Sequence, residues 1–551
     1  MKLKLPFTSF SIYYFGLIVM AIGLPLSPFM MSISQFIMLG ACLFDHPAWG
    51  KWNSFVASKG IYFYPLFFPW FILASLGGRF RQLFSDRTAL IISSIYLLHL
   101  IGLLYTTDMD FGLRDTRIKI PLLLMPLVIS TMPRLNTKQF RILLYVFCAA
   151  VFTGTMIGSG IMFGMIKKEI TDIRQVSIFV SHIRFSLMIC LSVFILAYYS
   201  IRERKYLSII LHVVFILWLS AYMVIIESLT GVFILLLEGS LLLAYFIFKR
   251  GNLLARTTFI ASLAISIWFI THALRTQVND FFVVRETADI HHLDSVTAHG
   301  HPYLNDLKNN ALQNGYFTGI YQCWEEMELA WNKKSKIKFS DLDKKGNQIR
   351  FTIVRYVSSK GLRKDQEGIE ALNANDIENI ENGYPDSRYP GLPTLKMRVE
   401  GIIWEFNEYS KGNDPSGHSV TQRFEFWRTA KEIISQHFLF GVGTGDPGIA
   451  FAEQYKINGT QLKEKYRLRS HNQFLAMGVA FGIIGVIWFL ISFFYPVLLR
   501  KNRKDLLFML FFIIAFISMI NEDTLETQAG VTFFAFFNSL FLFAQDENSG
   551  S

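Results

Sequence analysis

Long apolar runs, separated by short polar and often basic segments, occupy most of the chain. Several of these runs reach the roughly 18 residues that mark a membrane-spanning helix. The pattern predicts an all-α polytopic integral membrane protein with about twelve transmembrane helices. The expected spans are 10–25, 28–44, 88–106, 118–132, 139–164, 183–200, 206–226, 229–248, 257–274, 472–498, 505–520 and 528–544.

The longest polar segment divides the chain into three parts. Helices one to nine fall in 1–274, a large loop occupies 275–470, and the last three helices fall in 471–545. Within the loop, Gln313–Trp331 and Thr421–Gln436 are helix-like, and Thr421–Gln436 has the apolar spacing of an amphipathic helix. We therefore expect a mainly helical cap over the membrane helices rather than an independent enzyme.

Lysine and arginine clusters in the short loops predict the orientation, because such residues are enriched on the cytoplasmic side. If the spans alternate, one side receives Lys2/Lys4, Arg79/Arg81/Arg87, Arg134/Lys138/Arg141, Arg202/Arg204/Lys205, Lys249/Arg250/Arg256 and Arg500/Lys501/Arg503/Lys504. Both termini are then cytoplasmic and the 275–470 loop is periplasmic. Residues 61–77 are apolar enough to span, but a span there would invert every later loop, so we expect them to be interfacial or re-entrant.

Composition supports a membrane protein and argues against nucleic acid as a partner. The 551 residues are 52% hydrophobic and 15% aromatic, and the mean hydropathy is +0.35. The net charge of +11 does not indicate nucleic-acid binding, because many basic residues lie in the orientation clusters. No cleavage site follows the first apolar run, so no cleavable signal is expected. The four cysteines predict no disulfide framework.

His471 is the first candidate catalytic residue, since it lies where the polar loop meets the tenth span. Ser470 and Gln473 have the spacing of a capping box, which predicts Ser470 as N-cap and His471 as the first helical residue. The positive end of the helix would then favour an anionic ligand and a neutral imidazole. We therefore predict that His471 accepts a proton as a general base.

Arginines on the predicted outer face are candidate anion-binding residues. Arg184 lies at the start of the sixth span, where a guanidinium needs a partner, and a diphosphate would suit its paired donors. Arg423 and Arg428 flank the apolar face of the 421–436 helix. For the outer lysines, contact with lipid headgroups is the simpler interpretation.

Other polar motifs leave alternatives open. The glycine-rich loop 441–446 could bring backbone N–H groups near phosphate, but it lacks the lysine of a P-loop and no strand precedes it. The histidine-rich segment 289–301 admits a metal site, although a solvated loop is simpler. Glu238, in the eighth span, is either functional or paired with Lys249. The acidic turn 522–526 either orients His471 or an arginine, or is solvated.

The combined motifs resemble the O-antigen ligase/polymerase superfamily of membrane glycosyltransferases. The resemblance rests on Arg423-x-x-x-Trp427, the 441–446 loop, Tyr455, the block His471-Asn472-Gln473-Phe474-Leu475, and Gly482-x-x-Gly485. The layout of twelve spans, with a large outer loop before the last three, is similar to that of the ligase branch. Motif similarity is tight over about 421–490 and looser over 88–274.

The resemblance implies roles for individual residues. His471 would be the catalytic base, and Arg184 and Arg423 would bind the diphosphate, with Asn472 in the same substrate-binding block. The family often has a Ser-Arg-Gly-like turn after the seventh span, whereas this chain has Ser228-Leu229-Thr230-Gly231. The presence of a third phosphate-binding arginine is therefore in question, and Arg428 or Arg117 could take its place.

The implied reaction transfers a glycan from undecaprenyl diphosphate to a sugar hydroxyl of lipid A–core. It would occur at the periplasmic face of the bacterial inner membrane, with inversion and without metal or cofactor. A repeat-unit polymerase and a protein O-oligosaccharyltransferase remain open alternatives in the same family. A membrane transporter is the alternative of another class, against which stands the lack of paired halves with broken helices.

Overall fold

The computed structural model describes residues 8–45, 50–51, 54, 58, 64–170, 173–286, 288–289, 291–306, 311–391, 394–499 and 505–545. Within this part the chain is mostly helical, and its sheet is one short antiparallel hairpin of β1 (Leu312–Gln313) and β2 (Tyr316–Phe317). The predicted helical class is therefore confirmed. The chain forms two compact units: unit 1 comprises 1–242, 423–460 and 467–551, and unit 2 comprises 243–422 and 461–466.

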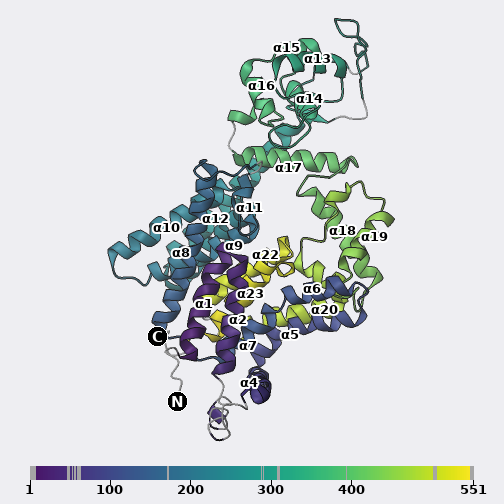
Figure 1. Cartoon of the computed structure of the whole chain (residues 1–551). Coiled ribbons are helices and arrows are strands. Elements are labelled where there is room, and N and C mark those ends of the chain that lie inside the picture. Colours follow the sequence, from purple (N-terminus) through teal and green to yellow (C-terminus); the bar gives the residue numbers. More distant parts are fainter. Residues whose placement is uncertain are drawn as a thin grey trace. The chain divides into compact units, whose positions relative to one another are not determined.

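Unit 1 contains the helices that hold the candidate site (Figure 1). They are α1 (Ser9–Leu26), α2 (Pro28–Phe44), α4 (Tyr64–Ser85), α5 (Arg87–Gly102), α6 (Met109–Ile118), α7 (Pro121–Thr131), α8 (Thr137–Met162), α9 (His182–Ser200), α10 (Tyr206–Ile225), α11 (Leu229–Arg250), α18 (Thr421–Gln436), α19 (Pro447–Ile457), α20 (Gln473–Leu498), α22 (Leu506–Asn521) and α23 (Gln528–Phe543). Helices α11 and α18 cross a unit boundary. A 3-10 turn, η6 (Thr524–Glu526), joins α22 to α23.

Eight helices of the described chain are long and apolar enough to cross a membrane. They are α1, α5 with its following turn, α8, α9, α10, α11, α12 (Leu253–Phe282) and α20. Helices α2, α22 and α23 are apolar but shorter. Helix α7 has 11 residues, about 17 Å at 1.5 Å per residue, against a hydrocarbon core of about 30 Å. The structure therefore supports eight candidate spans and does not confirm twelve.

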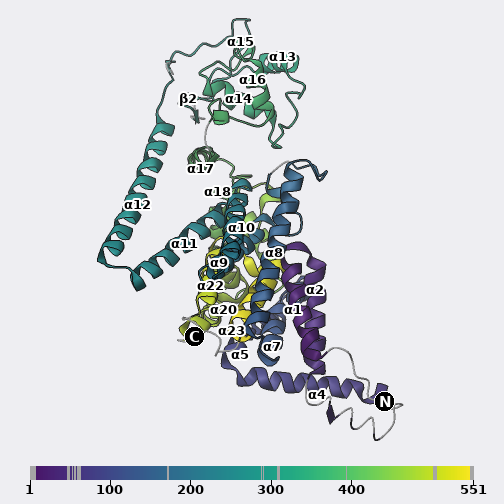
Figure 2. The same cartoon turned by 90° about the vertical axis from the view of Figure 1, so that its left-hand side faces the viewer.

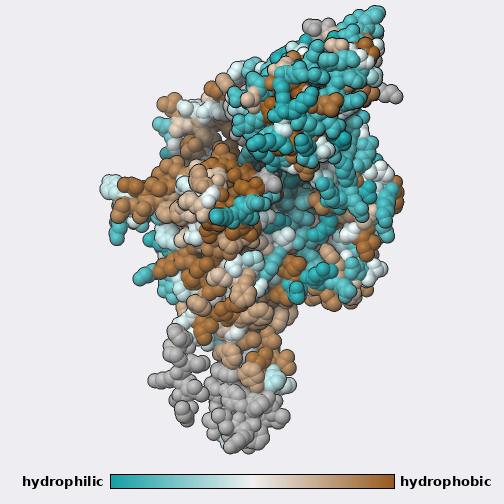
Figure 3. All heavy atoms as spheres, turned by 45° about the horizontal axis from the view of Figure 1, so that its top comes forward, coloured by the Kyte–Doolittle hydropathy of each residue, from teal (hydrophilic) through white to brown (hydrophobic). Residues whose placement is uncertain are grey.

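Several candidate spans expose large hydrophobic side chains over their outer faces (Figure 3). Leu207, Ile210 and Leu217 of α10 are exposed, as are Ile265 and Phe269 of α12. Exposed apolar surface of this extent is unfavourable in water and favourable against lipid. These helices therefore have the surface of a multi-pass membrane protein.

Aromatic packing holds the last three helices of unit 1 together. Phe493 of α20 stacks on Phe534 of α23, with ring centroids 5.9 Å apart. Phe511 of α22 contacts Phe537 of α23 at 6.0 Å. Each buried aromatic ring removes a large apolar area from the surroundings and contacts its neighbours with a preferred geometry. At the start of α20, Phe474 contacts Phe516 near the end of α22 at 6.0 Å, and the candidate site lies beside this contact.

The two ends of the unit 1 helices carry different polar groups. At one end Leu135, before α8, donates a backbone hydrogen bond of 2.7 Å to Ala544, after α23. Arg141 lies over the Tyr199 ring at the C-terminal end of α9, so the basic 134–141 and 202–205 segments share that end. The N-terminal end of α9, with Arg184, lies at the other end with His471. The basic loops and His471 are thus at opposite ends of the bundle.

Helix α4 lies across the ends of α1 and α2 rather than along them (Figure 2). Its buried Arg79 donates hydrogen bonds to the carbonyl oxygens of Thr131 at 2.5 Å and of Cys42 at 3.1 Å. The helix is not among the candidate spans. Residues 61–63 of the predicted interfacial segment 61–77 lie outside the described residues, and the placement of the segment at a membrane surface stays a prediction.

Unit 2 has a hydrophobic core of its own. Besides α12 and the hairpin it contains α13 (Trp324–Lys334), α14 (Ile349–Ser359), α15 (Gln366–Glu370), α16 (Ala374–Glu381) and α17 (Thr394–Ser410). Trp331, Ile353, Tyr356 and Ile380 are buried in this core. The predicted 313–331 helix is wrong in its first half, because Asn314 and Gly315 adopt positive φ and close the hairpin. Helix α12 also continues past the predicted boundary at 274.

Candidate active site

His471 precedes α20 and is not part of it. Asn472 is the N-cap, since its Oδ1 accepts a 2.9 Å hydrogen bond from the backbone N–H of Leu475. The predicted capping box of Ser470 and Gln473 is therefore wrong, and His471 is not helical but has a positive φ of 44°. Gln473 instead accepts from the backbone N–H of Leu525 at 2.7 Å. The imidazole is consequently held at a strained turn beside the helix, not on its first turn.

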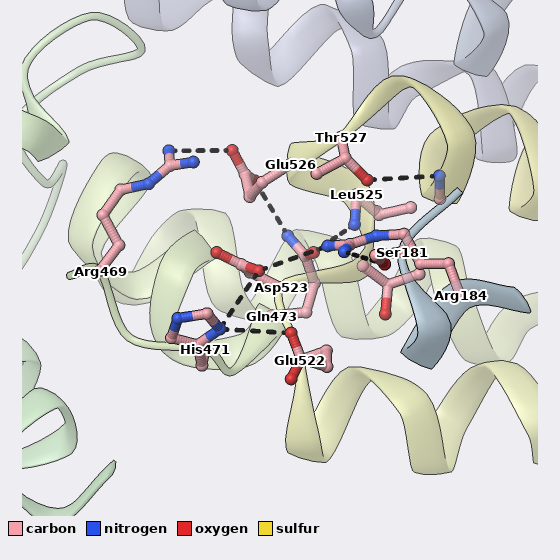
Figure 4. Close-up of polar contacts among 12 residues, drawn as sticks. Ser181, Arg184, Arg469, His471, Gln473, Glu522, Asp523, Leu525, Glu526 and Thr527 are labelled. Atoms are coloured by element: carbon pink, nitrogen blue, oxygen red, sulfur yellow. Dashed lines mark hydrogen bonds and ion pairs between the residues drawn. The ribbon is translucent and has the colours of Figure 1, made fainter. Parts of the chain in front are cut away.

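The His471 ring contacts two carboxylates of the acidic turn that follows α22. Its Nδ1 lies 3.2 Å from Glu522 Oε2 and 4.0 Å from Asp523 Oδ1 (Figure 4). An ionised carboxylate can only accept hydrogen bonds, so Nδ1 carries the proton and a neutral ring keeps its lone pair on Nε2. Both carboxylates are buried. Of the two alternatives for this turn, the structure supports orientation of His471.

The electrostatic surroundings keep Glu522 ionised. Burial alone would raise its pKa, but the hydrogen bond from His471 and the charges of Arg423 and Arg184 outweigh burial and lower it. For Asp523 burial has the larger effect, and its pKa is raised. The pKa values of the two adjacent carboxyl groups are therefore shifted in opposite directions. Glu522, whose pKa is lowered, is the better permanent partner for a histidine that becomes charged.

Two predicted arginines reach the same carboxylates. Arg423 of α18 donates to Glu522 Oε1 at 3.0 Å, and Arg184 of α9 lies 3.8 Å from Asp523 Oδ1. Arg184 also donates to Ser181 at 3.0 Å, which fixes its side chain at the start of α9. We call these five residues (His471, Glu522, Asp523, Arg184 and Arg423) the His471 cluster. Four segments far apart in the sequence thus supply one site.

A second group of charges adjoins this cluster. The expectation of headgroup contact is wrong for the outer lysine Lys119, because its side chain is buried and paired within the protein. Lys119 Nζ lies 2.6 Å from Asp115 and 2.9 Å from Glu526, and Arg469 lies 3.4 Å from Glu526. The side chains of Lys119, Asp115 and Glu526 are at most 10% exposed and that of Arg469 is 32% exposed, and we call these four residues, after the first three, the buried ion-pair group. Burial would raise the pKa of Glu526, but Lys119 and Arg469 lower it overall. The i,i+4 spacing of Asp115 and Lys119 was the available sequence signal.

The remaining predicted site residues lie outside the His471 cluster. Arg428 has a side chain 65% exposed and pairs with Glu432 on its own helix at 3.2 Å. Arg117 is exposed and makes no ion pair within the described residues. Asn472 donates to the carbonyl of Ile520 at 2.7 Å, which ties the start of α20 to the end of α22. Arg469 is better placed than Arg428 or Arg117 as an additional cation near His471.

The glycine-rich loop 441–446 makes a packed junction. The N–H groups of Val442 and Gly443 each donate at 2.9 Å to carbonyls of α20, and that of Gly445 donates to Thr106 at 2.8 Å. Gly441 has a φ of 68°, and a Cβ there would lie 2.4 Å from the Ala480 backbone. These N–H groups are used within the protein, so the loop is not a phosphate cradle of the kind considered from the sequence.

Candidate metal ligands in the described residues coincide with the His471 cluster. The ligand atoms of His471, Glu522 and Asp523 lie within 4.8 Å of one another. Arg423 and Arg184 already contact the two carboxylates, and their charge opposes a cation there. In the histidine-rich segment, His301 contacts Glu326 and His292 contacts Asp289, as separate pairs.

Glu238 of α11 does not pair with Lys249. Glu238 is buried, whereas Lys249 donates to Tyr245 one turn earlier on the same helix at 2.9 Å. The carboxyl oxygens of Glu238 have no hydrogen-bond partner among the described residues. The pairing considered from the sequence is therefore absent, and the residue is not part of the His471 cluster.

Comparison with known families locates a similarity at this site. Residues 389–490 match the family model described as O-antigen ligase. The matched segment includes Arg423, the 441–446 loop, Arg469 and His471, and it begins before the motif region predicted at 421–490. No curated protein matches the chain. The match confirms, over residues 389–490, the predicted resemblance to the O-antigen ligase superfamily, a family of membrane glycosyltransferases.

Proposed function

We propose that the protein is an O-antigen ligase-like glycosyltransferase. It moves a glycan from undecaprenyl diphosphate to a sugar hydroxyl of lipid A–core. The observation that carries the proposal is the shared use of Glu522 by His471 and Arg423, with Arg184 on the adjacent Asp523. A base and two guanidinium groups beside one another can carry out glycosyl transfer from a lipid diphosphate, since they supply proton removal and stabilisation of the departing charge.

In this mechanism His471 Nε2 accepts the proton of the acceptor hydroxyl. The hydroxyl oxygen forms a bond to the anomeric carbon as the bond from that carbon to the diphosphate oxygen breaks. In-line displacement of this kind inverts the anomeric centre. Glu522 holds the imidazole by its Nδ1–H and stabilises the charge that it gains, so His471 and Glu522 act as an oriented base. A positioned general base of this kind contributes about 10²- to 10⁴-fold.

Arg184 and Arg423 act on the leaving group. A guanidinium has five N–H donors, so an arginine held by one carboxylate can still donate to phosphate oxygens. The departing diphosphate is already a good leaving group and needs charge stabilisation rather than protonation. Guanidinium groups supply that stabilisation without a metal ion, so the proposed reaction is metal-independent and uses no cofactor.

The placement of charges supports a periplasmic active site in the bacterial inner membrane. His471 lies at the end of the unit 1 helices opposite the basic 134–141 and 202–205 segments. Because basic loops favour the cytoplasm, the His471 cluster then faces the periplasm and both termini are cytoplasmic. The donor and acceptor lipids would both reach it from the outer leaflet of that membrane.

Deletion of the gene, followed by electrophoresis of lipopolysaccharide and of glycoproteins, tests the assignment. A ligase predicts loss of all attached glycan, restored by the wild-type gene but not by one carrying His471→Ala. A single attached repeat would instead indicate a repeat-unit polymerase. An unchanged ladder with loss of a glycosylated protein would indicate a protein O-oligosaccharyltransferase, and an unchanged pattern in both would overturn the proposal.

A further inference from the structure

Unit 2 contains a groove that shares no residue with the His471 cluster. Its volume is about 780 Å³, and its walls come from α14, α17 and the segments 304–306, 311–324, 342–348, 383–385, 416–418 and 463–466. Binding sites for organic ligands have volumes of about 300–1,000 Å³. The groove therefore has room for a ligand of several rings, and nothing in the proposed mechanism uses it.

Aromatic rings and polar side chains alternate in the lining of the groove. Trp324, Phe351, Trp404 and Tyr466 line it together with Asn347, Gln348, Glu408 and His418. Trp324 and Phe351 meet edge to face with centroids 6.2 Å apart. The guanidinium carbon of Arg355 lies over the Trp404 ring, 4.1 Å from the ring centroid. This contact fixes the indole within the wall. The Arg350 guanidinium lies over one face of Phe351, 4.9 Å from the ring centroid, so the lining offers partly covered aromatic rings beside hydrogen-bonding groups.

Several charged side chains of the groove already contact other groups of the protein. Arg355 donates to Gln313 at 2.9 Å, and Lys463 lies 3.6 Å from Asp414. Glu408 contacts Lys411 at 3.4 Å. An anionic ligand such as a phosphate would have to displace these partners, and an acyl chain would leave the lining polar groups without hydrogen bonds.

A sugar ring fits this lining better than a phosphate or an acyl chain does. Each pyranose has a face of C–H groups that packs on an aromatic ring and an edge of hydroxyls that both donate and accept hydrogen bonds. We propose that the groove in unit 2 binds a hydroxyl-rich oligosaccharide. That this oligosaccharide is the glycan transferred at the His471 cluster rests on the proposed function.

Binding of free glycan to the full-length protein tests the groove without any turnover. The probe is O-polysaccharide fragments, released from lipopolysaccharide by mild acid and therefore lacking lipid and diphosphate. Saturation-transfer NMR titrations compare the wild type with Phe351→Ala and Trp404→Leu, each checked for unchanged thermal unfolding. Loss of one stacking ring should weaken binding roughly 3- to 10-fold.

Phe406→Ala is the matched control. Phe406 is 44% exposed on α17 and does not line the groove, whereas Phe351 is 50% exposed and does. The control should bind like the wild type. Equal affinity in Phe351→Ala, Trp404→Leu and wild type would overturn the proposal, as would loss of fragment binding in Arg423→Ala.

The result is separable from the proposed function. Groove-dependent binding together with an unchanged lipopolysaccharide ladder in the deletion strain would keep the glycan site and overturn the ligase assignment. Loss of the ladder without groove-dependent binding would keep the ligase assignment and overturn the glycan site.

Discussion

The His471 cluster and the buried ion-pair group have similar charges but different surroundings. Both draw carboxylates from the 522–526 turn and cations from distant segments. The His471 side chain is 30% exposed, whereas that of Lys119 is 0% exposed. A partly exposed group can exchange a protein partner for a substrate, while a fully buried one cannot. Exposure therefore distinguishes His471 from Lys119, whereas Arg469, whose side chain is 32% exposed, is as accessible as His471.

The energetics follow the same division. Removal of one partner from a buried ion pair costs about 3–5 kcal/mol, because the other charge stays buried without compensation. Exposed pairs such as Arg428–Glu432 contribute about 0–1 kcal/mol. The buried ion-pair group should thus affect folding, and the His471 cluster should affect activity.

His471→Ala should have the largest effect on activity, a loss of roughly 10³-fold in glycan transfer with normal insertion and donor binding, because the base acts only on the acceptor proton. The measurement is turnover of the purified protein with a lipid-linked donor. His437→Ala is the control, since His437 is an exposed histidine of unit 1 without an ion pair in the described chain. Near-normal turnover of His471→Ala would remove the residue from the mechanism.

Lys119→Met should destabilise the protein by about 3–5 kcal/mol, since Asp115 and Glu526 lose their buried partner. Thermal unfolding in detergent measures this loss of stability, with the exposed Lys333→Met as control.

The same group gives the fold a pH dependence. The folded pKa of Glu526 is below its ordinary 4.5. Its ion pairs therefore stabilise the fold above about pH 4.5 and weaken as the pH falls further. The variant should lose part of this acid sensitivity. Wild-type unfolding behaviour in Lys119→Met would show that the group is not a structural support.

Arg184→Ala and Arg423→Ala should each weaken donor-lipid binding on the order of 10- to 100-fold, because one charge-assisted contact contributes about 1.5–3 kcal/mol. Lysine at either position should rescue poorly, since it loses the planar fork. Direct binding of the lipid-linked donor gives the affinity. The matched controls are Arg428→Ala and Arg117→Ala, in which exposed arginines outside the cluster are removed and a change below about twofold is expected. Equal losses in all four variants would eliminate the distinction between cluster and surface arginines.

Exhaustive chelation should have the smallest effect, with no loss of transfer activity. His471, Glu522 and Asp523 could hold a cation by geometry, but two arginines compete for the same carboxylates. Activity is measured after treatment with EDTA and again after single divalent ions are returned. Loss on chelation with recovery by one ion would replace the arginine mechanism with a metal-assisted one.

The apolar runs correctly predicted most helices, and Arg184, Arg423 and His471 all contact the same acidic turn, while their roles stay predictions. Prediction failed where the outcome depended on contacts between distant segments. The cap moved from Ser470 to Asn472 because the side chain of Gln473 is used by Leu525 and Glu526. The 441–446 loop resembled an anion cradle, yet its N–H groups are bonded to α20 and Thr106.

The sequence by itself determined a helical membrane protein, because hydrophobic length and basic loops act locally on each segment. It also determined which residue types were available for proton transfer and diphosphate binding. Only the tertiary structure decided their partners: Glu522 for His471 and Arg423, and Glu526 for Lys119 and Arg469. The physical reason is that an ion pair depends on distance and burial in space, and residues 51 or more apart in the chain have no sequence pattern that specifies either.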